Sequence, residues 1–117
     1  MSVSSAKMSA VEASEDAAIE ELVQRLVEAL GPERIYLFGS RGRGEGGPES
    51  DYDLMVVVPG SDLPGYRRDQ LAYGALRGVQ VAKDVLVWTS DEFDFRRHLV
   101  ASLPATILRE GQLIYGG

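Results

Sequence analysis

Hydrophobic and polar positions in the first third of the chain predict one amphipathic helix. Between residues 15 and 30, apolar side chains recur at intervals of three and four residues, which is the spacing of one helix face. Ser14 is suited to cap the start of this helix, and Gly31-Pro32 ends it. We expect the apolar face to pack on a sheet. Residues 1–14 are small and polar, and predict a disordered lead-in.

Two apolar runs on either side of a glycine-rich segment predict two buried strands. The runs are Ile35–Phe38 and Leu54–Val58, and both are rich in β-branched or aromatic residues. Gly39 stops the first run and Pro59-Gly60 stops the second. Apolar runs of this length that are bounded by turn residues favour strands over helices.

In the second half of the chain, the pattern predicts helices and strands in turn. It predicts a helix over 63–77, a strand over 81–88, a helix capped by Ser90, a short helix from Leu103-Pro104, and a strand over 112–115. A helix between two strands permits a crossover connection, which is right-handed if the strands are parallel. The length of 117 residues suits one domain, which we place at residues 15–117.

Composition narrows the classes of protein to which the chain can belong. Twelve Lys and Arg against eighteen Asp and Glu give a net charge of −6, which argues against binding nucleic acid through bulk charge. The absence of cysteine excludes disulfides and thiolate metal sites, and fits a reducing cytoplasm. No apolar run is long enough for a membrane span, and no signal peptide is recognised. We therefore expect a soluble, cytoplasmic protein.

Two aspartates at the head of the second strand are candidates for a metal site. Side chains alternate along a strand, so Asp51 and Asp53 share one face, with Cα atoms roughly 7 Å apart. Tyr52 and Leu54 then point into the core. The two carboxylates repel each other unless a cation lies between them, and Mg²⁺ commonly binds one or two carboxylates together with substrate phosphates.

The glycine-rich segment does not match the two commonest phosphate-binding loops. Gly39 and Gly44 have the glycine spacing of a P-loop, but Glu45-Gly46 stands where Lys and Ser or Thr are required. Gly42-x-Gly44-x-x-Gly47 has the letters of a dinucleotide fingerprint. However, only residues 48–50 follow before the strand region, which leaves no room for the crossover helix of that fold.

The two-part motif resembles a different family. Phe38-Gly39-Ser40-Arg41-Gly42-Arg43-Gly44, followed by Ser50-Asp51-Tyr52-Asp53-Leu54, is similar to the motif of the nucleotidyltransferase superfamily that includes DNA polymerase beta and the aminoglycoside nucleotidyltransferases. The resemblance is closest to the minimal nucleotidyltransferases (MNT), which are often paired with a HEPN-domain partner in toxin–antitoxin systems. It extends from about Ile19 to Tyr115, and it implies an α/β (α+β) fold with helices packed on a small mixed β-sheet. Gly42 departs from the alanine or other small residue expected there, and we expect it to loosen the turn.

Asp84 interrupts the apolar run 81–88 and can be interpreted in two ways. A buried aspartate is costly unless it is paired, hydrogen-bonded or bound to a metal. It could therefore face water on an edge strand, or be paired in the neighbourhood of Lys83. The resemblance implies instead a third carboxylate that completes the metal site. His98 is the only histidine, and we interpret it as structural or exposed rather than as a base or ligand.

The resemblance also implies a role for each motif residue. Asp51 and Asp53 would bind two Mg²⁺ ions, and Asp84 would bind the ion at the acceptor hydroxyl and could take the proton from that hydroxyl. Gly39 would let the backbone approach the triphosphate, to which the Ser40 hydroxyl and amide would donate hydrogen bonds.

Three basic side chains have alternative interpretations. Arg41 and Arg43 could contact phosphate or a partner, or could simply be solvated residues of a basic loop. Arg68, on the predicted helix after the second strand, could contact a phosphate or a partner, but we expect it to be solvated.

Three functions are compatible with the sequence. The first is an Mg²⁺-dependent nucleotidyltransferase that moves AMP from ATP onto a hydroxyl, such as that of a tyrosine, on a HEPN toxin. The second is a non-catalytic antitoxin that neutralises its partner by binding alone. The third is a stand-alone transferase that acts on a small molecule such as an aminoglycoside. The chain shows no second domain that would grip a small acceptor or a nucleic acid, which favours an acceptor on a partner protein. A homo- or hetero-oligomer is compatible with each function.

Overall fold

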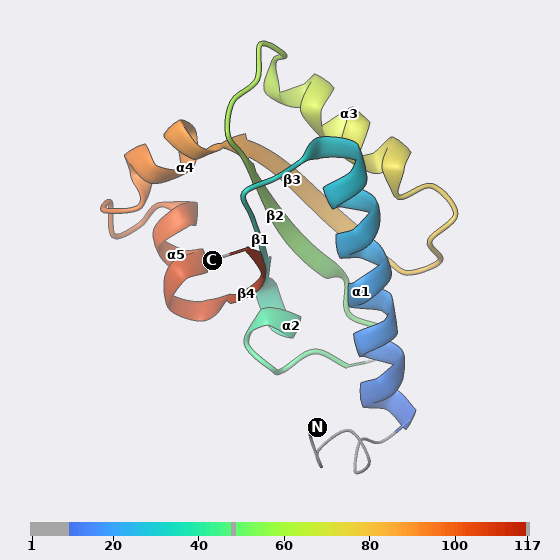
Figure 1. The fold of residues 1–117 in the computed structure, drawn as a ribbon. Helices are drawn as coiled ribbons and strands as arrows, with labels where there is room; N and C mark the ends of the chain where they lie inside the picture. The colour runs from blue at the N-terminus through green and yellow to red at the C-terminus, as the bar shows by residue number, and fades with distance from the viewer. Residues whose placement is uncertain (1–9, 48, 117) are drawn as a thin grey trace.

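The computed structural model describes residues 10–47 and 49–116, which form a four-stranded sheet with helices on both of its faces (Figure 1). The elements in chain order are α1 (Ala10–Leu30), β1 (Arg34–Phe38), α2 (Gly39–Gly42), β2 (Tyr52–Val58), α3 (Gly65–Ala75), β3 (Lys83–Thr89), α4 (Ser90–Arg96), α5 (Leu103–Glu110) and β4 (Gln112–Gly116). None of the helices in these described ranges has both the length and the apolar character that crossing a membrane requires.

The sheet is mixed, with strand order β3-β2-β1-β4. Strand β1 pairs antiparallel with β2 and with β4, whereas β2 pairs parallel with β3. Helix α3 lies in the connection between the two parallel strands. The predicted mixed sheet with helices packed on it is therefore confirmed.

Side chains from the two faces of the sheet form two separate cores. On the first face, Leu22 and Leu26 of α1 and Leu76 at the end of α3 pack on alternate residues of β2 and β3. On the second face, Phe93 of α4 and Ile107 of α5 pack on Tyr36, Met55 and Val57. Figure 1 shows α1 and α3 on one side of the sheet and α4 and α5 on the other. Leu22 and Leu26 are fully buried, so the apolar face of α1 packs on the sheet as predicted.

The first helix is longer than its hydrophobic pattern indicates. It begins at Ala10, so the predicted lead-in is wrong for residues 10–14, and Ser14 is not the N-cap. The added segment includes Ala10, Glu12 and Ala13, and residues of these types have high intrinsic helix propensity, which is independent of the apolar period. Residues 1–9 lie outside the described residues.

Two boundaries in the second half also differ from the prediction. The helix predicted over 63–77 is confined to Gly65–Ala75, and the strand predicted from Val81 begins at Lys83. Thr89, not Ser90, caps α4, because its hydroxyl accepts from the Glu92 amide while Glu92 accepts from the Thr89 amide. The spacing of Thr89 and Glu92 is the sequence pattern of a capping box, and this pattern identifies the correct cap.

Candidate active site

The two halves of the sequence motif meet where β1 ends and β2 begins. Phe38 pairs with Asp53 across the antiparallel ladder, and Gly39 follows directly. Gly39 has a φ of +69°, and a Cβ built on it would collide with Oδ2 of Asp53. A glycine is therefore required here both for the backbone conformation and for the close approach of the carboxylate. Ser40 is the next residue, in the single turn of α2.

The strand places the first two aspartates as the alternation predicts. Tyr52 and Leu54 are buried in the core, with 4% and 0% of their surface exposed. Asp51, directly before β2, is exposed, and Asp53 is half-buried. Both carboxylates are thus kept out of the core that the alternate residues fill.

Asp84 lies opposite Asp53 in the parallel pairing of β2 and β3. Its side chain is exposed, and its Oδ1 accepts a hydrogen bond of 3.0 Å from the hydroxyl of Tyr73 on α3. Lys83 donates instead to the carbonyls of Val79 and Val81, so Asp84 is not paired with this neighbour. The strand order thus brings the third aspartate beside the first two.

Asp53 is affected by burial and by the charges of the other two aspartates. Burial, then the charge of Asp84, then that of Asp51 raise the pKa of the Asp53 carboxyl. Within residues 10–47 and 49–116, no Lys, Arg or His forms an ion pair with any of the three. Carboxylates without a cationic partner, at the N-terminal ends of β2 and β3, are suited to bind a hard divalent cation.

The carboxylate oxygens are not gathered around one point. Among the described residues, no group of three His, Cys, Asp or Glu is arranged to hold a metal ion. The oxygen donors of Asp51, Asp53 and Asp84 therefore fit Mg²⁺ in their chemistry, but their carboxylates do not converge on one metal position. Their roles as metal ligands stay a prediction.

Both arginines of the glycine-rich turn contact other protein groups. The Arg41 guanidinium lies 4.0 Å from the centre of the Tyr52 ring, and its Nε donates to the Ser50 carbonyl at 2.8 Å. Arg41 is 9% exposed, so it is not the solvated loop residue that one interpretation expected. Arg43 forms ion pairs with Glu45 at 3.0 Å and Glu110 at 3.8 Å. A phosphate contact by either arginine stays a prediction, and would require a change in these contacts.

Gly42 tightens the turn, contrary to the expectation that it loosens it. A Cβ at Gly42 would lie 2.5 Å from the Leu37 carbonyl oxygen, so only glycine allows this approach. The Gly42 carbonyl also accepts a hydrogen bond of 3.0 Å from the Gln112 side chain of β4. The turn is thereby held against β1 and β4.

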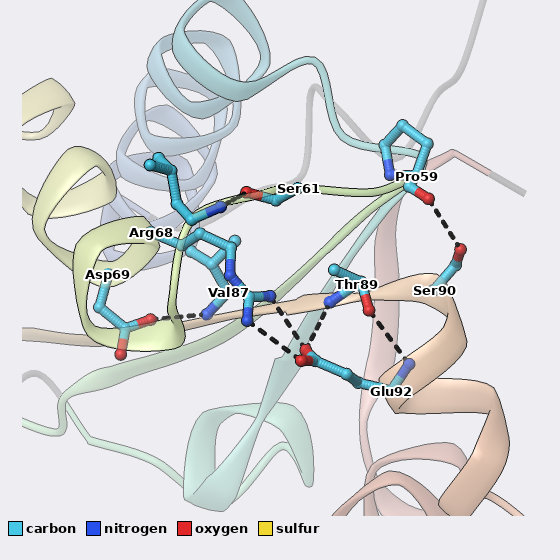
Figure 2. A network of polar contacts seen from close by, with 9 residues as sticks. Pro59, Ser61, Arg68, Asp69, Val87, Thr89, Ser90 and Glu92 are labelled. Carbon is cyan, nitrogen blue, oxygen red and sulfur yellow. Dashed lines mark hydrogen bonds and ion pairs between the residues drawn. The ribbon is translucent and has the colours of Figure 1, made fainter.

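A polar network fastens α3 and α4 to the outer edge of β3 (Figure 2). Arg68 forms a bidentate ion pair with Glu92, at 2.9 and 3.1 Å, and Glu92 also accepts from the Thr89 amide. Asp69 accepts from the Val87 amide at 2.9 Å. Hydrogen bonding by Arg68 is the largest cause that lowers the pKa of Glu92. The expectation that Arg68 is solvated is wrong, because it is 6% exposed.

Tyr73 also contacts the outer edge of β3, and the sequence pattern does not identify it as a residue near the site. Its hydroxyl donates to Asp84 and accepts from the Val85 amide at 2.9 Å. Burial and the Asp84 carboxylate raise the pKa of the Tyr73 hydroxyl, although the bond from Val85 opposes them. The predicted helix has a weak apolar pattern, so no local signal distinguishes Tyr73 from Tyr66. His98, by contrast, is exposed after α4, as interpreted.

Most of the chain matches the model of a known protein family. Residues 19–114 match the family model of the nucleotidyltransferase domain. No curated protein matches the chain. The matched range 19–114 includes the whole glycine-rich turn and all three aspartates.

Several solved structures share the fold. A toxin–antitoxin crystal structure with AMP-PNP has 20% identity and a TM-score of 0.60, covering 85% of this chain and 73% of that one. A Sulfolobus solfataricus protein assigned as a nucleotidyltransferase has 20% identity and a TM-score of 0.65, covering 93% and 89%. The toxin–antitoxin MntA-HepT has 18% identity and a TM-score of 0.57, covering 87% and 73%. At these identities the likeness shows the fold alone.

Proposed function

Because the chain belongs to the nucleotidyltransferase domain family, we propose that it is an Mg²⁺-dependent enzyme that transfers AMP from ATP to a hydroxyl of a partner protein. The observation that supports this most is the meeting of Gly39-Ser40 with Asp53, with Asp84 opposite on β3. A phosphate-binding turn beside clustered carboxylates is what nucleotidyl transfer requires.

Each residue has a defined task in the proposed reaction. Gly39 lets the backbone approach the triphosphate, and the Ser40 hydroxyl and amide donate hydrogen bonds to its oxygens. Asp51, Asp53 and Asp84 would hold Mg²⁺, which, when bound, offsets the negative charge on the reacting oxygens. The acceptor oxygen forms a bond to the α-phosphorus, the bond from that phosphorus to the bridging oxygen breaks, and pyrophosphate leaves. Asp84 accepts the proton of the acceptor hydroxyl.

The proposed acceptor is a hydroxyl, such as that of a tyrosine, on a HEPN toxin. Two observations support this choice. The motif resembles the MNT proteins, and two of the structures that share the fold are described as toxin–antitoxin complexes, one of them with AMP-PNP. ATP is proposed as the nucleotide because AMP-PNP is an ATP analogue. The chain would then act as an antitoxin that modifies its partner.

One observation favours a second function, neutralisation of the toxin by binding alone. Among the described residues the carboxylates are not arranged around a metal ion, and both arginines of the turn have partners within the protein. A domain that had lost catalysis while keeping its interface would have these features. The two functions differ in whether the partner becomes covalently modified.

Replacement of Asp53 separates the two functions. We expect the wild-type chain, incubated with α-labelled ATP, Mg²⁺ and the product of the neighbouring gene, to place label on that product. Asp53→Ala should abolish labelling, because it removes a central carboxylate, and should leave the fold intact, because it relieves repulsion. Asp62→Ala is the matched control, since Asp62 is an exposed aspartate in the loop after β2. Tight binding without label, unchanged in Asp53→Ala, would instead establish the binding-only function.

A further inference from the structure

We propose that Tyr73 is a positioning residue that holds the Asp84 carboxylate in the orientation needed for transfer. This inference rests on the proposed function, because it assigns a task to a residue that supports the same site. Tyr73 lies on α3, eleven residues before Asp84, and contacts it across the outer edge of β3.

Two hydrogen bonds fix the direction of the Tyr73 hydroxyl. The oxygen accepts from the Val85 amide at 2.9 Å, and the hydroxyl donates to Asp84 Oδ1 at 3.0 Å. A phenol has a single hydrogen, so with the Asp84 bond in place the hydroxyl cannot donate elsewhere. Among the described residues nothing donates to Oδ2 of Asp84. This oxygen remains accessible to an acceptor hydroxyl or a cation while Oδ1 is held.

Protection of the strand edge is the alternative explanation for Tyr73. Strand β3 is an edge strand, and its outward amides at Val85, Val87 and Thr89 would otherwise be open to pairing with another chain. Side chains of Tyr73, Asp69 and Glu92 accept from these three amides in turn. Only Tyr73 among the three also donates to a site carboxylate. Asp69 therefore serves as a natural control for edge protection without a contact to Asp84.

The test is Tyr73→Phe, which removes only the hydroxyl. We expect about 10-fold weaker binding of Mn²⁺ to the free protein, measured by electron paramagnetic resonance, because loss of an outer partner typically weakens a metal site by that factor or more. The kcat for labelling should fall by a similar factor, and the KM for ATP should stay within about twofold, since the phosphate turn is untouched. Asp69→Ala and Tyr66→Phe are the controls for edge protection and for loss of a tyrosine hydroxyl on α3, and should match the wild type.

A third measurement keeps this inference separate from the proposed function. Side-chain couplings of Asp84, measured by NMR without metal or nucleotide, should indicate one χ1 rotamer in the wild type and averaged rotamers in Tyr73→Phe. If the wild type neither labels a partner nor binds Mn²⁺, the proposed function fails, and the rotamer measurement still decides the role of Tyr73. The inference is overturned if the Asp84 rotamer is the same in both proteins, or if Asp69→Ala lowers Mn²⁺ affinity and kcat as much as Tyr73→Phe does.

Discussion

At Gly39, the backbone leaves β1 with a φ of +69° and passes directly against the Asp53 carboxylate. At the scale of single residues, this contact joins the glycine-rich turn to β2. Arg41 supports it from the other side, by stacking on Tyr52 and donating to the Ser50 carbonyl. The local chemistry of the site thus depends on close packing as well as on charge.

Gly39→Ala tests this packing. We expect a loss of about 1–2 kcal/mol in the free energy of unfolding, because an L-residue is strained at positive φ, together with loss of labelling, because the new Cβ displaces Asp53. Gly44→Ala is the matched control, since Gly44 has a φ of +76° but no atom within 4 Å of a Cβ placed there. Urea unfolding and the labelling assay measure the two effects. Equal labelling in the two variants would contradict the proposed role of the contact.

At the scale of elements, the outer edge of β3 is the place where α3 and α4 are fastened to the sheet. The Arg68–Glu92 ion pair spans the two helices, and Glu92 also completes the capping box of α4. Arg68 is buried, whereas the Glu92 side chain is 42% exposed. Because α3 also carries Tyr73, this ion pair contributes to the position of the helix that contacts Asp84.

Glu92→Gln should therefore destabilise the protein by about 1–3 kcal/mol, because the buried Arg68 loses a charged hydrogen-bond partner. The pKa of Glu92 is lowered in the folded state, so its stabilising effect is present above the ordinary carboxyl pKa and is lost as pH falls through the lowered value. The difference from wild type should accordingly be full at pH 7 and disappear in acid. Urea unfolding at several pH values measures it.

Glu21→Gln provides the comparison for this prediction. Glu21 and Arg25 form an exposed ion pair at 3.0 Å within α1, and exposed pairs contribute only about 0.2–1 kcal/mol. A loss in Glu92→Gln no larger than that in Glu21→Gln would show that the Arg68 contact does not fasten the helices.

At the scale of the whole molecule, two cores on opposite faces of the sheet hold Asp53 at the N-terminal end of β2, where the charges of Asp84 and Asp51 repel it. The β1–β2 pairing brings Asp53 to the glycine-rich turn, and the connection through α3 returns the chain so that Asp84 lies beside Asp53. The stability of the cores offsets this repulsion. The carboxylates that the proposed function requires are therefore expected to lower the stability of the fold.

Asp53→Asn should increase the free energy of unfolding at pH 7 by about 0.2–1 kcal/mol, the usual size of a charge pair across strands. The pKa of Asp53 is raised in the folded state, so the penalty is full above that raised value and absent below the ordinary pKa of 3.8. The gain should therefore vanish as the pH falls through this window. Urea unfolding of both proteins measures it, and Asp62→Asn should show no such gain. A gain that persists in acid would exclude charge repulsion as the cause.

Residues close together in the chain could be predicted from the sequence for reasons of local geometry. Alternation along one strand placed Tyr52 inside and Asp51 and Asp53 outside the core, and the glycine spacing identified the turn before them. Helix boundaries were less predictable, because α1 begins at Ala10, before the first position of its apolar pattern, where helix propensity and not periodicity favours the helix. The mixed sheet was expected only because the two-part motif resembles that of a known family.

The contacts between distant segments were decided by the tertiary structure alone. The strand order placed Asp84 opposite Asp53, and the packing of α3 placed Tyr73 on Asp84. A glycine at position 42 was expected to loosen the turn. In the structure, Gly42 instead packs closely against the Leu37 carbonyl and accepts a hydrogen bond from Gln112, seventy residues away. Periodicity reports which face of an element is buried, but strand order and register depend on how separate elements pack, and neither is encoded in any one of them.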